Sequence, residues 1–274
     1  TMLAYELEPE IYNFGLLQDL LHVSRGRSCH IHIKFDTGMH RLGFQKADVA
    51  RLAELLNENP HLKVKSVFSH LAGADDSRHN SFSIQQAEHF ESMTDSFIKL
   101  TNTAPLKHLL NSSGIVRFPQ YQYDMVRLGI GLYGVEANRR EQEKLEPISR
   151  LLTIISQIKE VKKGETVGYD RKGLAERDMK IATIAIGYAD GFSRAFSNGV
   201  GYVWINGRRA PVVGNVCMDM TMVDVTGIPA REGDIAEVFG PNISISEMAR
   251  AIGTIPYEIL TNVSQRVRRV FYSE

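Results

Sequence analysis

The sequence has few cysteines and no long apolar stretch. Its 274 residues include only two cysteines, Cys29 and Cys217. Two cysteines cannot build a disulfide framework, so we expect a reducing compartment. No apolar run approaches the ~20 residues of a membrane-spanning helix, and the first residues lack the basic start and apolar core of a signal peptide. We therefore expect a soluble cytoplasmic protein.

The chain also lacks net charge. Lys and Arg together number 32, and Asp and Glu together also number 32. This balance argues against a nucleic-acid or membrane-surface partner, because both need a basic field. It leaves room for a local basic site that binds a small anion. The hydrophobic fraction of 43% is high enough to fill a sizeable core.

The N-terminal half alternates between strand and helix patterns. Apolar residues at helical spacing predict helices over 14–23, 49–56 and 83–98, the last one opened by a capping box of Ser83 and Gln86. The expected strands are AYELEP (4–9), HIHIKF (30–35), KVKSVFSH (63–70), LKHLLN (106–111) and MVRLGIGLYG (125–134).

This alternation predicts a parallel α/β sheet whose strands end in polar clusters. Catalytic groups lie at the carboxyl ends of the strands in a (β/α)₈ barrel. Such a barrel needs eight strands, and residues 1–143 supply about five. The sequence therefore predicts an incomplete (β/α)₈ barrel over 1–143, with the preceding part of the barrel missing from this chain.

From residue 144 onward, short strands with turn signals replace the helical patterns. Asn206-Gly207 between YVWI and RRAPVV predicts a tight hairpin, because both turn positions favour positive φ. ISISEMARAI (243–252) predicts one short helix. We expect a mostly β domain over 144–274, with a polar boundary near 140–148.

Several polar residues follow the predicted strands of the first half. Lys34 and Arg41 belong to KFDTGMHRLGF, which suits an active-site loop but also a surface ion-pair loop. His70 ends an apolar strand, where a histidine is more often structural. NSSG (111–114) could bind an anion or simply cap a helix. Arg127 lies in an apolar segment, so it needs either a ligand or an internal carboxylate.

Two turns of the second half add further candidates. GYADG contains Tyr188, although a loop tyrosine usually packs against its neighbours. CMD contains Cys217 and Met218. We expect Cys217 to be a small buried apolar side chain rather than a nucleophile. No cluster of potential metal ligands stands out, so no metal site is expected.

Together these motifs resemble the pyridoxal-phosphate-dependent alanine racemases. KxDTGMxRxGF, the NS loop, DMVRxGI, GYADG and CMD occur in the order that this family has, from residue 34 to the C-terminal QRVRRVF. The resemblance implies an isomerase that interconverts L- and D-alanine with pyridoxal 5'-phosphate and supplies D-alanine for peptidoglycan. It also implies a homodimer whose active site is shared between subunits.

The resemblance assigns catalytic roles to Lys34, Arg41, His70 and Tyr188, and a cofactor-binding role to Arg127. Lys34 matches a lysine that is carbamylated in many members, and its carbamate would orient Arg41 toward the cofactor and the substrate carboxylate. Arg127 would face the pyridine nitrogen. An arginine keeps its proton, so the electron sink is weakened and transamination is suppressed. His70 would link Arg127 to Tyr188, the base on one face of the substrate.

Further residues are expected to hold the cofactor and the substrate. The phosphate would be held by Ser112 and the amides of Gly129 and Ile130, with Asn111 beside them. Met218 would donate its backbone N–H to the substrate carboxylate. Where many racemases have a phosphate-contacting tyrosine, this chain has Gln265, for which we expect a weaker contact.

One expected segment is absent. The family's cofactor lysine lies in a KANAYGHG-like segment, and this sequence contains none. We expect the chain alone to be inactive, and its start suggests a fusion to a MurF-like ligase. Other hypotheses remain open: a racemase of serine or another amino acid, a decarboxylase of a basic amino acid, or a non-catalytic dimerisation module that supports a fused cell-wall ligase.

Overall fold

Four short strands form a parallel sheet in the N-terminal half, in the order β1-β2-β3-β4. The structure is a computed structural model that describes residues 2–136 and 142–272. A helix follows each strand, as the alternating patterns predict. The elements are β1 (Glu10–Ile11), α1 (Phe14–Ser24), β2 (Cys29–Lys34), α2 (Val49–Glu58), β3 (Leu62–Phe68), α3 (Asn80–Thr101), β4 (Leu106–His108) and α4 (Ser112–Arg117).

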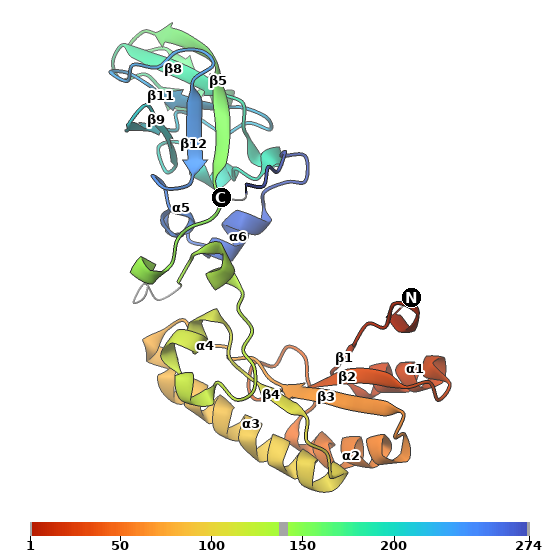
Figure 1. Cartoon of the computed structure of the whole chain (residues 1–274). Coiled ribbons are helices and arrows are strands. Elements are labelled where there is room, and N and C mark those ends of the chain that lie inside the picture. Colours follow the sequence, from red (N-terminus) through yellow and green to blue (C-terminus); the bar gives the residue numbers. More distant parts are fainter. Residues whose placement is uncertain (1, 137–141, 273–274) are drawn as a thin grey trace. The chain divides into compact units, whose positions relative to one another are not determined.

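The apolar core of this half lies between the sheet and its helices. Ile31 and Ile33 of β2 are fully buried, in one cluster with residues of α1, α2 and α3, and Figure 1 shows α2 and α3 along one face of the sheet. Side chains alternate along a strand, so His32 and Lys34 point to the opposite face. That face carries the polar groups described below.

The predicted first strand, AYELEP, is wrong in its position. Residues Met2–Tyr5 form a 3₁₀ helix, and β1 begins only at Glu10, where it pairs with His32 of β2. Pro9 separates the two segments, and its carbonyl accepts a hydrogen bond from the His32 amide at 3.0 Å. Because proline has no N–H to donate, Pro9 contributes only its carbonyl, and the strand pairing with β2 begins at Glu10.

The predicted fifth strand, 125–134, is also wrong. Among the described residues of this segment, Met125 forms one isolated bridge with His108, and Ile130–Tyr133 is a 3₁₀ helix. The amides of Gly129 and Gly131 donate to a side-chain oxygen instead of a neighbouring strand. The sheet therefore has four strands among the described residues, not about five.

The capping box predicted at Ser83 and Gln86 is wrong as well. Helix α3 begins at Asn80, so both residues lie within it, and both are buried. The Gln86 side chain accepts from the Ala72 amide at 2.9 Å and donates to the His70 carbonyl at 3.1 Å. Gln86 thus fixes the loop that follows β3.

The chain divides into two compact units. One comprises Thr1–Leu132 with Glu136–Lys144, and the other comprises Tyr133–Val135 with Leu145–Glu274. The predicted boundary at 143/144 falls in the same region, although residues 137–141 of the predicted linker lie outside the described residues. Every helix that the structure describes is too short or too polar to cross a lipid bilayer.

The second unit is built on an antiparallel sheet in the order β10-β9-β12-β5-β8-β11. An isolated bridge between Val212 and Val223 joins the two ends of this order, so the sheet closes on itself. Its elements are β5 (Leu151–Val161), β6 (Thr166–Val167), β7 (Gly173–Leu174), β8 (Met179–Ile184), β9 (Tyr202–Ile205), β10 (Arg208–Pro211), β11 (Thr221–Asp224), β12 (Ile235–Phe239), α5 (Ile245–Ala251) and α6 (Pro256–Thr261).

The hairpin and the helix predicted from the sequence of this unit are both present. Asn206 and Gly207 have φ of 46° and 84° and join β9 to β10, which confirms the predicted hairpin. The helix predicted over 243–252 is α5, capped by the Ser244 side chain. Three helices and strands of this unit were not predicted: β5, which pairs with both β12 and β8, the short strand β7, and helix α6.

Candidate active site

The loop after β2 is closed by hydrogen bonds of its own. Asp36 Oδ1 accepts from the amides of Gly38 and His40, both at 3.0 Å. Burial alone would raise the pKa of Asp36, but these two amides outweigh it and the pKa is lowered. At the far end, the Phe44 amide donates to the Lys34 carbonyl at 2.9 Å. The Asp of the DTG motif therefore builds the loop that carries Arg41, whose side chain is exposed.

Lys34 ends β2 with its side chain almost fully buried. Its Nζ lies 2.8 Å from Oε1 of Glu10 on the neighbouring strand β1 and 5.3 Å from the centre of the Phe68 ring. A carboxylate and an aromatic face both favour a cation. Lys34 Nζ therefore forms an ion pair with Glu10, whereas the expected carbamate would place a negative charge beside that carboxylate.

Arg127 is held by more acceptors than any other predicted site residue of this unit. One terminal nitrogen donates to His108 Nδ1 at 2.5 Å and to the His108 carbonyl. The other donates to the carbonyls of Ser69 at 2.6 Å and Leu109 at 3.2 Å, and lies 3.3 Å from His70 Nδ1. Its Nε–H has no partner among the described residues, so it is the donor that remains for a ligand.

Burial explains the charge states around this guanidinium. It lowers the pKa of Arg127 to about 10, so the group stays protonated at neutral pH. His70 has its pKa lowered to about 4, first by burial and then by the positive charges of Arg127, Arg41 and Lys34. His70 is therefore a neutral imidazole whose Nδ1 accepts, which leaves its proton on Nε2.

Ser112 is nearly buried and lies beside the glycine-rich segment. Its Oγ accepts from the amides of Gly129 at 2.8 Å and Gly131 at 3.3 Å. The Ser112 O–H donates to no described residue, so it is available to an anion. Asn111 has a structural task as the cap of α4, where it accepts from the Gly114 amide at 2.9 Å. Ile130 is buried.

In the second unit, the GYADG and CMD turns are hydrogen-bonded to each other. The Tyr188 amide donates to the Cys217 carbonyl and the Ala189 amide donates to the Met218 carbonyl, both at 3.0 Å. A Cβ on Gly187 would lie 2.2 Å from the Cys217 oxygen, so only glycine permits this approach. Tyr188 and Met218 are both about half exposed, at 43% and 54%.

An arginine that the sequence reasoning missed fixes these turns to the C-terminal segment. Arg266 Nε donates to Asp190 at 2.7 Å, and its terminal nitrogen donates to Asp219 at 2.5 Å. The Ser264 amide donates to the Asp190 carbonyl at 3.0 Å. Gln265, between them, has an exposed side chain. Cys217 has its pKa raised by burial, which disfavours a nucleophilic thiolate.

The structure thus brings the predicted residues together in two groups, one in each unit. Three further residues of the first group, Glu10, Phe68 and His108, were missed by the sequence reasoning. All three lie on the sheet face opposite the helices, so the alternation of side chains along the strands could have indicated them. Among the described residues there is no cluster of three or more side chains suited to a metal ion.

Comparisons with known proteins agree along nearly the whole chain. The family model described as alanine racemase, N-terminal domain, matches residues 1–137, and the model of the C-terminal domain matches residues 148–271. The chain is 38% identical to an alanine racemase of Halothermothrix orenii over 88% of its length, and 35% identical to one of Methanococcus maripaludis over 98%. It spans 65% and 74% of those relatives, respectively.

Solved structures extend the match to the fold. Alanine racemase from Streptomyces lavendulae aligns with a TM-score of 0.94 and 30% identity, covering 100% of this chain and 74% of that one. The enzyme of Bartonella henselae, solved with covalently bound pyridoxal phosphate, aligns at 0.89 with 29% identity, covering 99% and 75%. These matches confirm the predicted fold class, an α/β barrel domain followed by a mostly β domain. The chain belongs to the alanine racemase family.

Proposed function

We propose that this chain carries the catalytic framework of a pyridoxal-phosphate-dependent alanine racemase. The family match along both domains supports the reaction, and the relatives are themselves named alanine racemases. The observation that carries the proposal is the guanidinium of Arg127, held by five carbonyl or imidazole acceptors with the Nε–H uncommitted.

The donors that are present fit the cofactor. Arg127 offers Nε–H to a ring nitrogen, which would then accept a hydrogen bond without taking a proton, since the arginine retains its own at neutral pH. Ser112 offers an O–H next to two glycine amides, which suits a phosphate. When bound, pyridoxal phosphate supplies an electron sink that acidifies the Cα–H of alanine.

Arg127 limits how strong that sink becomes. An acceptor bonded to a guanidinium N–H does not gain a full positive charge, because the arginine keeps its proton. With Arg127 as its partner, a bound cofactor would thus be a weaker electron sink, which would favour racemisation over transamination. His70, neutral and partly buried beside Arg127, adds no further charge to this environment.

Tyr188 is proposed as the acid–base group for one face of Cα. Its turn is held rigidly by hydrogen bonds to the CMD turn and by the Asp190–Arg266 ion pair, so the phenol has a fixed anchor. We propose that Tyr188 and Met218 act on the active site of a partner subunit in a homodimer. The Met218 amide would bind the substrate carboxylate, and Arg41, on the loop after β2, would contact the same carboxylate.

The second base is expected to be a lysine outside the printed residues. None of the 274 residues forms a KANAYG-like segment, so we propose that they do not racemise alanine by themselves. A fusion to a MurF-like ligase stays part of this proposal, and a cytoplasmic location rests on the two unpaired cysteines.

A direct assay tests the function. The parent protein, including any segment that precedes these residues, is mixed with pyridoxal phosphate and L-alanine, and D-alanine is measured with a D-amino-acid oxidase. We expect D-alanine from the parent protein and none from the 274 residues. Tyr188→Phe should lower kcat about 10²- to 10⁴-fold, the usual loss for a general acid–base group.

Tyr169→Phe is the matched control, because Tyr169 is another exposed tyrosine of the same unit. A parent protein that makes no D-alanine would contradict the proposed function. Rapid D-alanine formation by the 274 residues would contradict only the proposed need for a further lysine.

A further inference from the structure

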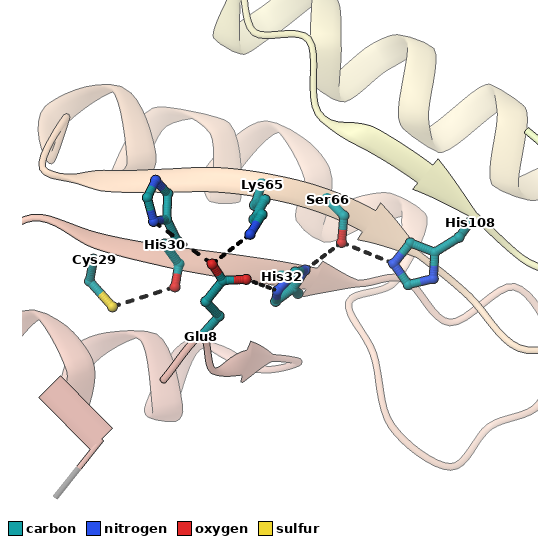
Figure 2. Close-up of polar contacts among 7 residues, drawn as sticks. All are labelled: Glu8, Cys29, His30, His32, Lys65, Ser66 and His108. Carbon is teal, nitrogen blue, oxygen red and sulfur yellow. Dashed lines mark hydrogen bonds and ion pairs between the residues drawn. The ribbon is translucent and has the colours of Figure 1, made fainter. Parts of the chain in front are cut away.

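A row of polar side chains crosses the first unit on the sheet face opposite the helices. It consists of Glu8, which precedes β1, His32 of β2, Ser66 of β3 and His108 of β4, and we call these four residues the polar row. Figure 2 shows His32 between Glu8 and Ser66, and Ser66 between the two imidazoles. The last imidazole contacts Arg127.

The contacts in the row are short and continuous. Glu8 Oε2 lies 3.0 Å from His32 Nε2, and His32 Nδ1 lies 2.6 Å from Ser66 Oγ. Ser66 Oγ lies 3.0 Å from His108 Nε2, and His108 Nδ1 lies 2.5 Å from a terminal nitrogen of Arg127. His108 is also stacked on Phe68, with ring centres 4.8 Å apart.

The two ends of the row determine the direction of every hydrogen bond. A guanidinium only donates and an ionised carboxylate only accepts. His108 Nδ1 must therefore accept from Arg127, which places the imidazole proton on Nε2, where it donates to Ser66. Ser66 then donates to His32 Nδ1, and His32 donates from Nε2 to Glu8.

The buried hydroxyl of Ser66 excludes the main alternative. A protonated His32 would donate from both nitrogens, so Ser66 would have to accept twice. Ser66 is 0% exposed, and within the described part of the chain the two imidazoles are its side-chain partners. Its own hydrogen would then be buried without an acceptor, which is costly. Both imidazoles are therefore neutral.

The charges at the two ends agree with this direction. Glu8 is ionised, because hydrogen bonds from Lys65 and His32 lower its pKa. At the other end, burial lowers the pKa of His108 to about 4, and the neighbouring positive charge of Arg127 adds to the effect. His108 is therefore neutral at the pH where Arg127 is charged.

An irregularity in β3 makes the row possible. Ile31 pairs with Val64 and His32 pairs with Ser66, so Lys65 is one extra residue in β3, a β-bulge. The bulge lets Lys65 reach Glu8 Oε1 at 2.7 Å while the next residue, Ser66, still joins the row. Without the extra residue, one of the two would turn toward the helices.

We infer that Glu8, His32 and Ser66 are positioning residues for the guanidinium group of Arg127. They touch neither substrate nor cofactor in the proposed function, on which this role rests. They fix the tautomer of His108, whose Nδ1 lone pair then holds Arg127 in one orientation. The carboxylate at the far end polarises each bond in turn, which makes that lone pair a better acceptor.

The tautomers can be measured directly in the 274-residue chain without any cofactor. Long-range ¹H–¹⁵N spectra of the histidine rings at neutral pH should show His32 and His108 as neutral rings protonated at Nε2. A cationic ring, or a proton on Nδ1 of either residue, would overturn the inference. This outcome does not depend on the reaction, so it separates the inference from the proposed function.

Variants test whether the row acts on Arg127. Ser66→Ala should speed the rotation of the Arg127 guanidinium about fivefold, as the Nη signals would show, because one hydrogen bond contributes about 1 kcal/mol. Ser83→Ala is the matched control, since Ser83 is a buried serine of the same unit whose hydroxyl has no partner. Equal effects of the two changes would refute the role.

Changes at the exposed end avoid the risk of a misfolded core. Glu8→Gln keeps an acceptor oxygen for His32, so both tautomers should persist while Arg127 rotates somewhat faster. Glu8→Ala removes the acceptor, so mixed tautomers of His32 and faster rotation of Arg127 are expected. If Glu8→Ala leaves the tautomers and the rotation unchanged, Glu8 has no positioning role.

Discussion

Acid should weaken the first unit in a narrow pH range, because two neutral histidines lie beside Arg127. The pKa values of His70 and His108 are each lowered from 6.5 to about 4, mainly by burial. Below pH 6.5 the unfolded chain therefore binds protons that the folded unit does not. The contribution of these two histidines to the free energy of unfolding should stay constant above that pH and fall steadily down to about pH 4.

The size of the effect follows from His108, which is only 4% exposed. A difference of about 2.5 pKa units amounts to at most about 3 kcal/mol, of which about 2 kcal/mol is lost by about pH 5. With a urea dependence of about 2 kcal/mol per molar, the midpoint should fall by about 1 M. His70 is more exposed and adds a smaller amount.

The chain contains its own control for this measurement. All nine histidines lie at or before residue 108, so the second unit has none, and the single tryptophan, Trp204, lies in β9 of the second unit. Urea unfolding followed by circular dichroism at 222 nm reports mainly α1, α2 and α3, whereas tryptophan fluorescence reports the second unit. Only the first transition should move between pH 6.5 and 5.

His108→Asn keeps an acceptor for Arg127 but does not titrate, so its shift should be clearly smaller. The reasoning is refuted if the wild-type transition at 222 nm does not move, or if it moves equally in His108→Asn.

Three further changes test other parts of the structure. Gly187→Ala puts a Cβ 2.2 Å from the Cys217 carbonyl oxygen, so the melting temperature of the tryptophan transition should fall by about 5 °C or more; an unchanged value would contradict the close approach. Gly207→Ala forces alanine to φ of 84° without any steric contact, so the free energy of unfolding measured in urea should fall by about 1 kcal/mol. An unchanged free energy would show that this turn does not require glycine. Glu10→Gln removes the carboxylate that is paired with Lys34 and that a negatively charged carbamate would meet, so ¹³C-bicarbonate should give a stronger carbamate signal than in the wild type; equal signals would show that Glu10 does not control carbamylation.

Much of the fold was predictable because local signals agree with tertiary packing. The alternation in HIHIKF and the helical spacing over 49–56 each place apolar residues on one face, and the structure buries those faces. Asn206-Gly207 specified its hairpin through backbone preference alone. In these segments no distant partner is needed to decide the structure.

The errors arose where a distant partner decides. MVRLGIGLYG has strand composition, but the Ser112 hydroxyl accepts from Gly129 and Gly131 and draws the backbone into a 3₁₀ turn. Likewise Ser83 and Gln86 form the sequence pattern of a capping box, yet Gln86 is needed by the loop that follows β3. In both cases the hydrogen-bond partners are more than ten residues apart in sequence, so the local pattern cannot reveal them.

The site residues that were missed could be recognised from the sequence only when the first two strands are compared with each other. Glu8 and Glu10 lie two residues apart, as do His32 and Lys34, and the first strand pairs with the second so that Glu10 is opposite His32. Each carboxylate thus reaches a basic side chain of β2, and the bulge adds Lys65 as a third basic partner. A polar face inside an α/β sheet must be charge-paired to be stable. Acidic alternation in one strand therefore predicts basic alternation in its neighbour, and this pairing identifies the first strand better than its apolar content does.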